Sequence, residues 1–373
     1  MQVVVDGIIY QLQASGGVSR IFTEILPRMC DQDDSLRIAL LTEGKLKQSL
    51  PNSHPNILHQ TIPQIERYLR PRRMWRYVAP KVGGIVRKLC IGRGRGKIWH
   101  STYYTIPENW SGSSVATVVD MTYERFTNLF SKPRDESFRA RKRRCVLEAD
   151  AVICISEATC RDVQRFYGLD SSSIYVVPLA CSDVFRQLGQ SGEGLKRPIR
   201  EPFLLYVGNR KNYKNVNTLF QAYSAWPGRK EISLVIVGEI WSDDEECQLA
   251  ELGIQAYVHL FTDVSDDELC RLYNQAVAFV YPSFYEGFGI PLLEAMACGC
   301  PIISSRIPST IEVAEDCPIY FDPDEPDELR NAFDVVLSEG RNSERVRTGF
   351  KRVNQYSWDK TAVQTLEVYR AIS

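Results

Sequence analysis

Short apolar, β-branched runs alternate along the chain with longer segments in which apolar residues recur every three or four positions. Such runs are typical of buried parallel strands, and the longer segments of helices that cover a sheet on both faces. The pattern therefore predicts two doubly wound, Rossmann-like α/β domains. Strands are expected in the first half at residues 3–6, 37–41, 97–100, 116–120, 151–155 and 174–177. In the second half they are expected at 203–208, 234–238, 257–261, 276–281, 301–304 and 319–321.

The charge distribution also indicates two domains. Residues 1–190 hold 27 Lys and Arg against 18 Asp and Glu, a balance of +9, which leaves 18 against 28, or −10, for the remainder. We expect an N-terminal domain at 1–190, a Gly- and Pro-rich linker at 191–202, and a C-terminal domain at 203–356. The amphipathic segment 357–373 is expected to be a helix, and the sequence leaves open whether it packs on the first domain.

Composition narrows the class of protein. With 373 residues, 44% apolar and 24% charged, the chain is neither disordered nor a coiled coil. No run approaches the roughly 18 apolar residues of a membrane span, and the first ten residues lack a basic signal region. Eleven cysteines lie scattered in apolar segments, which favours free thiols in a reducing compartment. We expect a cytoplasmic protein and, because no ligand cluster stands out, no metal site.

The most informative stretch is residues 281–299, YPSFYEGFGIPLLEAMACG. An apolar strand runs into a turn with two glycines, and Pro291 follows where a helix can begin. Such a turn lets backbone N–H groups approach an anion at the positive end of the helix. Glu286 precedes the turn and Glu294 follows it, so one carboxylate can reach a sugar and the other a ribose. Spacing alone fits equally well a buried βα unit whose glutamates are solvated or cap the helix.

This spacing, with GFGIP inside it and EAMACG after it, resembles the signature of the retaining, nucleotide-sugar-dependent glycosyltransferases of family 4. The resemblance implies a GT-B fold, in which two Rossmann-like domains face a central cleft. The domain at 1–190 would then lie on the acceptor side, and the domain at 203–356 would bind the nucleotide sugar. It implies transfer of a sugar from a UDP- or GDP-linked donor to a saccharide or lipid-linked saccharide, in cell-surface polysaccharide or glycan synthesis. It also implies retention at the anomeric carbon, with no metal or other cofactor.

The resemblance also assigns roles to residues. In the segment VGNRKNYKN, Gly208 precedes the basic pair Arg210 and Lys214, which would neutralise the donor diphosphate, and Lys211 competes with them for that role. Preorganised cations there stabilise the charge that the leaving group gains. The other donor-binding residues that it implies are Glu286 with the backbone of Phe288 and Gly289 at the sugar, Ile290 beside them, Glu294 at the ribose, and Gly16 and Gly17 against the phosphates.

One departure from the family concerns the transferred sugar. The family commonly has a His-Asp pair at a strand end where this chain reads Val119-Asp120. An apolar side chain suits a methyl better than a hydroxyl, which suggests a 6-deoxyhexose or pentose donor. Asp120 is a candidate for the active-site face but is not assigned as a base. His100, which ends another predicted strand, and Tyr103, which follows it, are candidates for acceptor contacts, although a core histidine fits His100 equally well.

A basic stretch lies outside these motifs. Residues 66–97 contain 11 basic residues and one acidic residue, with aromatic and aliphatic residues between them, and residues 139–144 form a second basic cluster. This composition suits peripheral binding at an anionic membrane face. A solvated basic surface would look the same, and we expect no nucleic-acid partner because only a short Gly-Arg-Gly-Arg piece resembles a motif.

Two other functions remain open at this point. The fold would also suit a sugar-nucleotide epimerase, which needs no acceptor. A non-catalytic sugar-nucleotide binder or membrane-attached scaffold would keep the fold without the chemistry, although the two glutamates and the diphosphate cations favour an enzyme.

Overall fold

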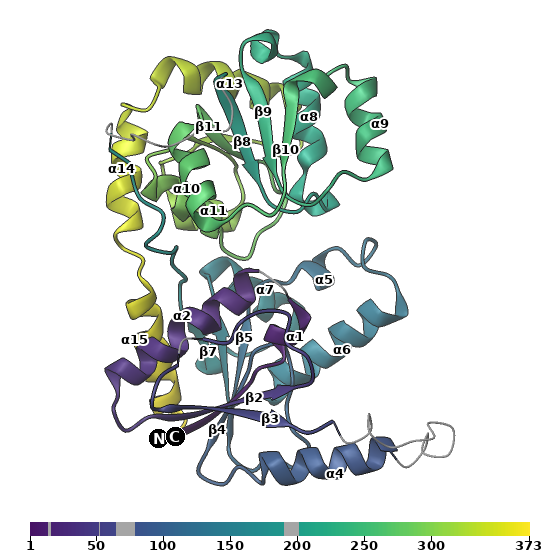
Figure 1. Cartoon of the computed structure of the whole chain (residues 1–373), viewed down its shortest axis with the longest axis vertical. Coiled ribbons are helices and arrows are strands. Elements are labelled where there is room, and N and C mark those ends of the chain that lie inside the picture. The colour runs from purple at the N-terminus through teal and green to yellow at the C-terminus, as the bar shows by residue number, and fades with distance from the viewer. Residues whose placement is uncertain (14–15, 52, 65–78, 190–200) are drawn as a thin grey trace. The chain divides into compact units, whose positions relative to one another are not determined.

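The computed structural model describes residues 1–13, 16–51, 53–64, 79–189 and 201–373 (Figure 1). The chain divides into two compact units, and each is described by itself. The first unit joins Met1–Leu179 to Trp358–Ser373, and the second is Ala180–Ser357.

In the described residues, the first unit is built on one parallel sheet in the order β3-β2-β1-β4-β5-β6-β7. The order reverses beside β1, as in a doubly wound fold. Its strands are β1 Gln2–Asp6, β2 Arg37–Glu43, β3 Ile57–Ile62, β4 Ile98–Ser101, β5 Ser113–Val118, β6 Ala151–Cys154 and β7 Ile174–Val176. Its helices are α1 Ile9–Leu12, α2 Gly17–Gln32, α4 Ala79–Ile91, α5 Thr122–Arg125, α6 Pro133–Glu148, α7 Glu157–Tyr167, the short 3₁₀ helix η2 Ser171–Ser173 and α15 Trp358–Ala371.

The second unit repeats the plan with a parallel sheet in the order β10-β9-β8-β11-β12-β13. Its strands are β8 Phe203–Val207, β9 Ser233–Val237, β10 Val258–Phe261, β11 Ala278–Tyr281, β12 Ile302–Ser305 and β13 Ile319–Phe321. Its α-helices are α8 Val216–Ala225, α9 Asp243–Glu251, α10 Asp266–Gln275, α11 Ile290–Ala297, α12 Pro308–Ala314, α13 Pro326–Glu339 and α14 Glu344–Val353. Its 3₁₀ helices are η3 Asn212–Lys214, η4 Pro227–Lys230 and η5 Gln255–Tyr257.

The predicted fold class is confirmed, and every predicted strand is present. One strand, β3, was not predicted. Its sequence, ILHQTI, is polar in the middle, and Leu58 and His59 are exposed. Because β3 pairs only with β2 and forms the edge of the sheet, it needs no continuous apolar run.

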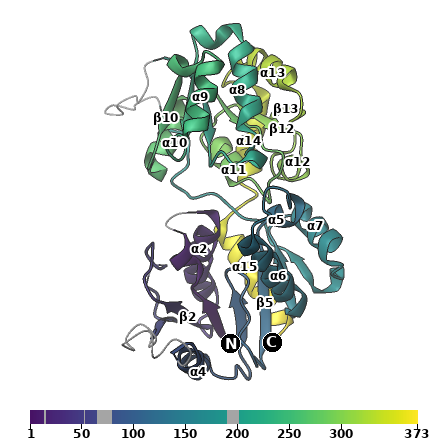
Figure 2. The ribbon, with the colours of Figure 1, turned by 90° about the vertical axis from the view of Figure 1, so that its right-hand side faces the viewer.

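The last helix completes the first unit. It packs along α2, from which it is separated by most of the sequence (Figure 2). Within the unit, Thr361 Oγ1 donates a hydrogen bond to the carbonyl of Pro178 at 2.7 Å. The Tyr369 hydroxyl lies 2.5 Å from His100 Nδ1. The C-terminal helix therefore belongs with the first sheet.

The second unit begins earlier than the predicted boundary at residue 190. The ring of Phe185 packs edge-on against Tyr273, and the Leu188 N–H donates to Asn274 Oδ1 at 2.8 Å. These contacts hold residues 180–189 on the second unit. The predicted linker at 191–202 lies almost entirely outside the described residues.

Candidate functional site

Two of the predicted site residues, Lys214 and Glu286, meet at the carboxyl ends of β8 and β11. Lys214 Nζ lies 2.7 Å and 2.8 Å from the two carboxylate oxygens of Glu286, so the pair is bidentate. Ser283 Oγ donates a further hydrogen bond to Glu286 Oε1 at 2.6 Å. The side chains are 17% and 11% exposed, so the pair is largely buried but keeps some accessible surface. In doubly wound parallel sheets, ligands bind at the carboxyl ends of the strands.

Asn215 fixes the loop that carries Lys214. It adopts the left-handed conformation (φ 56°) before α8, and its side-chain amide donates to the carbonyls of Pro282 at 3.0 Å and Pro323 at 2.8 Å. A backbone hydrogen bond of 2.9 Å from Phe284 to the Tyr213 carbonyl joins the same two loops. Lys214 and Glu286 are therefore brought together by bonds between their loops as well as by charge. The sequence analysis missed Asn215 and Ser283, and only their positions beside these two residues hinted at a role.

The glycine turn after Glu286 has the predicted form. Gly289 has φ +125°, and a Cβ there would lie 3.0 Å from Leu292 Cδ1, so the turn requires glycine. Pro291 lies in the first turn of α11, where a missing N–H costs nothing. Phe288 is buried against the ring of Tyr356, and Ile290, at the start of α11, is half-buried. The turn is thus rigid, while its contact with a sugar stays a prediction.

Glu294 lies on the buried side of α11, with 5% of its surface exposed. Tyr273 of α10 donates its hydroxyl hydrogen to Glu294 Oε2 at 3.1 Å. Burial together with the Glu294 charge raises the pKa of the Tyr273 phenol well above its usual value, so the phenol remains a donor. Tyr273 holds Glu294 in place, and the ribose role of Glu294 remains a prediction.

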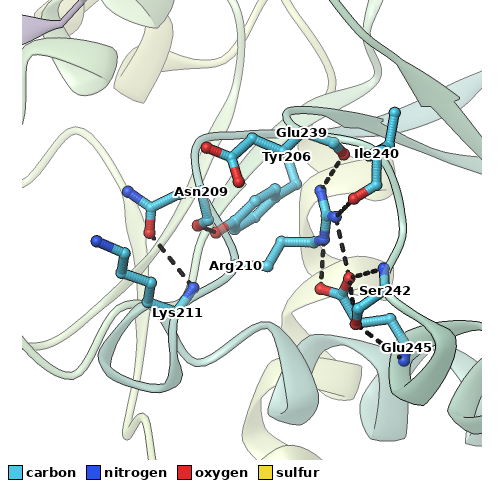
Figure 3. Close-up of polar contacts among 8 residues, drawn as sticks. All are labelled: Tyr206, Asn209, Arg210, Lys211, Glu239, Ile240, Ser242 and Glu245. Carbon is cyan, nitrogen blue, oxygen red and sulfur yellow. Dashed lines mark hydrogen bonds and ion pairs between the residues drawn. The ribbon is translucent and has the colours of Figure 1, made fainter. Parts of the chain in front are cut away.

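Arg210 is surrounded by protein groups (Figure 3). Its Nε and Nη2 donate to the two carboxylate oxygens of Glu245 at 2.6 Å and 3.0 Å. Its Nη1 and Nη2 donate to the carbonyls of Glu239 and Ile240, each at 2.9 Å. The guanidinium also stacks over Trp241 at 4.3 Å, and the side chain is only 5% exposed.

This placement differs from the expectation that Arg210 faces a diphosphate. Glu245, in the first turn of α9, supplies the carboxylate that holds the guanidinium, and Gly238 makes room for it. A Cβ on Gly238 would lie 2.7 Å from the Gly208 carbonyl and 3.0 Å from Arg210 Nη1. Arg210 therefore ties the loops after β8 and β9 together as a positioning residue. The exposed Lys211 points away from Arg210 in Figure 3 and stays available for an anion.

Arg210→Ala should destabilise the second unit by about 3 kcal/mol, because it leaves the largely buried Glu245 carboxylate without its cation. Thermal unfolding checks this, with Lys211→Ala as the neighbouring control that leaves the transition unchanged. Arg210→Lys should restore part of the loss, since lysine keeps the charge but not the bidentate geometry. An unfolding transition in Arg210→Ala equal to that of the unmodified chain would contradict the assignment.

The candidate donor residues of the first unit lie at two places. Gly16 and Gly17 stand at the start of α2, where the Gly16 carbonyl accepts from Ser19 Oγ at 3.0 Å. A Cβ on Gly17 would meet none of the described residues within 4 Å. Val119 and Asp120 follow β5 and are both half-buried. An Asp120 carboxylate oxygen accepts from the Thr122 N–H at 2.9 Å, which closes a local turn. Backbone can therefore approach a ligand at Gly17, and the Val119 side chain is partly accessible.

His100 is a core residue, and the expectation that it contacts an acceptor is wrong. It is fully buried, with Nδ1 2.5 Å from the Tyr369 hydroxyl and Nε2 2.8 Å from Thr117 Oγ1. Both ring nitrogens are occupied by the fold, which leaves none for a substrate. Tyr103 is half-buried and its ring packs against Phe138 at 5.3 Å.

Burial lowers the pKa of His100 from 6.5 to about 3, so the fold accommodates the neutral ring. The contribution of the neutral His100 ring to folding stability is fully present above pH 6.5 and is lost as the pH falls through 6.5 toward 3. Between pH 6.5 and pH 4 the loss should reach about 3 kcal/mol. Hydrogen exchange of β4 and α15 amides at several pH values measures it. His100→Gln should flatten this dependence, and an equally steep dependence in that variant would refute the explanation.

The comparisons with known proteins agree with this picture. The family model described as Glycosyl transferases group 1 matches residues 193–352. The chain is 28% identical over 284 residues to an O-antigen chain mannosyltransferase B of Escherichia coli, covering 74% of each chain. It is 29% identical over 234 residues to an MMP alpha-(1->4)-mannosyltransferase of Mycolicibacterium hassiacum, covering 61% of this chain and 56% of that protein.

Solved structures resemble the whole chain. A sucrose-phosphate synthase from Thermosynechococcus elongatus superposes with a TM-score of 0.75 at 20% identity, covering 99% of this chain and 98% of the other. Anabaena Alr3699/HepE in complex with UDP-glucose superposes with a TM-score of 0.71 at 16% identity, covering 100% of both. At these identities the likeness concerns the fold.

Proposed function

We propose that this chain, a group 1 glycosyltransferase of GT-B fold, transfers a sugar with retention from a nucleotide diphosphate to a saccharide or lipid-linked saccharide hydroxyl. The observation that carries the proposal is the bidentate Lys214–Glu286 pair at the carboxyl ends of β8 and β11, inside the segment matched by the family model. The mannosyltransferases among the relatives, one of them an O-antigen enzyme, support polysaccharide synthesis as its setting.

The pair suits the departure of a nucleotide diphosphate. Negative charge develops on the phosphate oxygens as the sugar leaves, and a cation already in position stabilises that charge without reorganisation. Lys214 is held in position by Glu286 before any ligand arrives. When a diphosphate takes over the ammonium group, the Glu286 carboxylate, still bonded to Ser283, is free to accept hydrogen bonds from sugar hydroxyls. The acceptor proton passes to the departing phosphate oxygen, as front-face retention requires, so no side-chain base is assigned.

The test is nucleotide release coupled to the anomeric configuration of the product. Thermal-shift screening of UDP-, GDP- and dTDP-sugars first identifies the donor, since a ligand present at 100 times its Kd stabilises the folded state by about 2.7 kcal/mol. Transfer is then followed by NMR, and an α-linked donor should give an α-linked product. The reaction should proceed in EDTA, because the proposal assigns the charge on the departing diphosphate to Lys214. An inverted product, or activity that EDTA abolishes and magnesium restores, would contradict the proposal.

The side chain of Val119 predicts which donor sugar the chain prefers, and this preference can be measured. A 6-deoxy donor should be used with a kcat/KM about tenfold higher than the parent 6-hydroxylated donor, since an apolar side chain offers the hydroxyl no partner. Val119→His should reverse the preference. Steady-state kinetics with GDP-mannose and its 6-deoxy counterpart measures both effects. Equal or better use of the 6-hydroxylated sugar by the unmodified chain would remove the role of Val119 and leave a mannosyl donor, which the relatives' names favour.

An anionic membrane surface is part of the proposal, with the protein peripheral on the cytoplasmic face. Residues 66–78 of the basic stretch lie outside the described residues. The described part of α4 supports the proposal, because Ile85 and Leu89 are 58% and 77% exposed one turn apart, beside the exposed Arg87 and Lys88. Among the described residues no helix is both long and apolar enough to cross a bilayer.

A further inference from the structure

A cavity of about 720 Å³ in the first unit brings together the two basic stretches that stand apart in the sequence. One wall comes from the end of α4 and the Arg93 that follows it. The facing wall comes from Arg141 and Arg144 on α6, and segment 104–109 lies between them. The site described above does not use any of these residues.

The cavity has an apolar floor and a charged rim. On the floor, Trp99, Tyr104 and Cys145 are each 3% exposed or less. On the rim, the side chains of Lys88 and Arg144 are 54% and 70% exposed. A ligand that fills this cavity therefore meets aromatic surface at depth and positive charge at the opening.

The cations of the rim outnumber its carboxylates. Five Lys and Arg side chains line the cavity, against two glutamates. In the described part of the chain, no ion pair joins Arg93 or Arg141 to a carboxylate, and both residues are exposed. The ion pairs at the rim are Arg87 with Glu43 at 3.8 Å, Lys88 with Glu108 at 2.8 Å and Arg144 with Glu148 at 2.8 Å. An anion at the opening thus finds two cations that need not give up a carboxylate partner.

We propose that this cavity binds an anionic amphiphile, a phosphate or diphosphate group carried on a hydrocarbon chain. The chain lies against the aromatic floor, and the phosphate accepts charge-assisted hydrogen bonds from Arg93 and Arg141. Leu89 lines the cavity, and Ile85, one turn earlier on the same face of α4, adds exposed apolar surface beside it. Phospholipid headgroups and the lipid phosphate of an acceptor share this chemistry. Binding here does not depend on the proposed transfer reaction.

Calorimetric titration of the full chain tests the proposal with three probes: dodecyl phosphate, inorganic phosphate and dodecyl maltoside. Only dodecyl phosphate combines the charge and the chain, so it should bind far more tightly than the other two. Arg93→Gln and Arg141→Gln should each weaken it about fivefold, the effect of one basic side chain at an anionic surface. Lys351→Gln, an exposed lysine of the second unit, is the matched control and should bind as the unmodified chain does.

Equal binding of dodecyl maltoside, or unchanged binding in both arginine variants, would overturn the proposal. Because Arg93 and Arg141 are exposed, their variants should unfold at the same temperature as the unmodified chain. Co-sedimentation then separates the two sources. Pelleting with phosphatidylglycerol vesicles supports a membrane headgroup, and pelleting only with vesicles that contain an isoprenyl diphosphate supports the acceptor lipid. Pelleting with neither vesicle would again overturn the proposal, whatever the chain's transfer activity.

Discussion

Glu286→Ala should lower kcat for sugar transfer by about 10²- to 10³-fold, the loss typical of removing one preorganised polar group from a transition state. The substitution removes the carboxylate that receives Lys214 at 2.7 Å and Ser283 at 2.6 Å, and it leaves the lysine without its partner. Glu286→Gln should retain more activity, because its amide keeps one of the two acceptor oxygens. Steady-state kinetics with the donor found by thermal shift measures both variants.

The control for this variant is Glu344→Ala, which removes an exposed glutamate of α14 in the same unit. It should leave kcat unchanged. If Glu286→Ala transfers sugar at the normal rate, the non-catalytic sugar-nucleotide binder becomes the better explanation. If it loses transfer but releases free sugar or an epimer from the donor without acceptor, the epimerase does.

Lys214→Ala should reduce kcat/KM by about 10³-fold, since the developing charge on the diphosphate then loses the cation that Glu286 holds in position. Donor affinity should fall as well, because Lys214 also attracts the diphosphate in the ground state. Lys214→Arg should recover part of the rate, since charge is kept while the geometry changes. Kinetics of the two variants, with nucleotide diphosphate titrated by calorimetry, separates the effect on kcat from the effect on binding.

The double variant Lys214→Ala with Glu286→Ala gives a sharper test. Residues in contact show interaction energies of about 0.5–3 kcal/mol, so the combined loss should be smaller than the product of the single losses. Strictly multiplicative losses would mean that the two side chains act independently, contrary to the 2.7 Å contact.

The sequence predicted most strands of both sheets, but it did not predict the edge strand β3 or the boundary between the two units. Buried strands such as β9 and β11 are continuous apolar runs that pair on both sides, so their pattern is unambiguous. The edge strand β3 is polar in the middle, so its pattern did not predict a strand. The unit boundary was missed because Phe185 and Leu188 pack on α10 through contacts that no local pattern encodes.

The candidate site was predicted as residue types but not as contacts. Nothing local shows that Lys214 and Glu286, 72 positions apart, form a bidentate pair. The partner of Arg210 was equally hidden, because Glu245 reads as an ordinary helix-start acid in a capping box. His100 was wrongly predicted to contact an acceptor. A histidine at the end of a strand is a reasonable candidate from the sequence, and only the fold shows that Tyr369, 269 positions later, contacts its ring.

The first unit includes α15, which is the last helix of the chain to be synthesised. The first unit therefore cannot be complete when its first 179 residues have left the ribosome. All residues of the second unit, 180–357, emerge before the helix that completes the first. The contact between His100 and the Tyr369 hydroxyl therefore cannot form until the second unit has been synthesised. The N-terminal sheet, although made first, thus finishes folding last during synthesis, and cutting the gene at residue 179 would yield a fragment that lacks part of its own core.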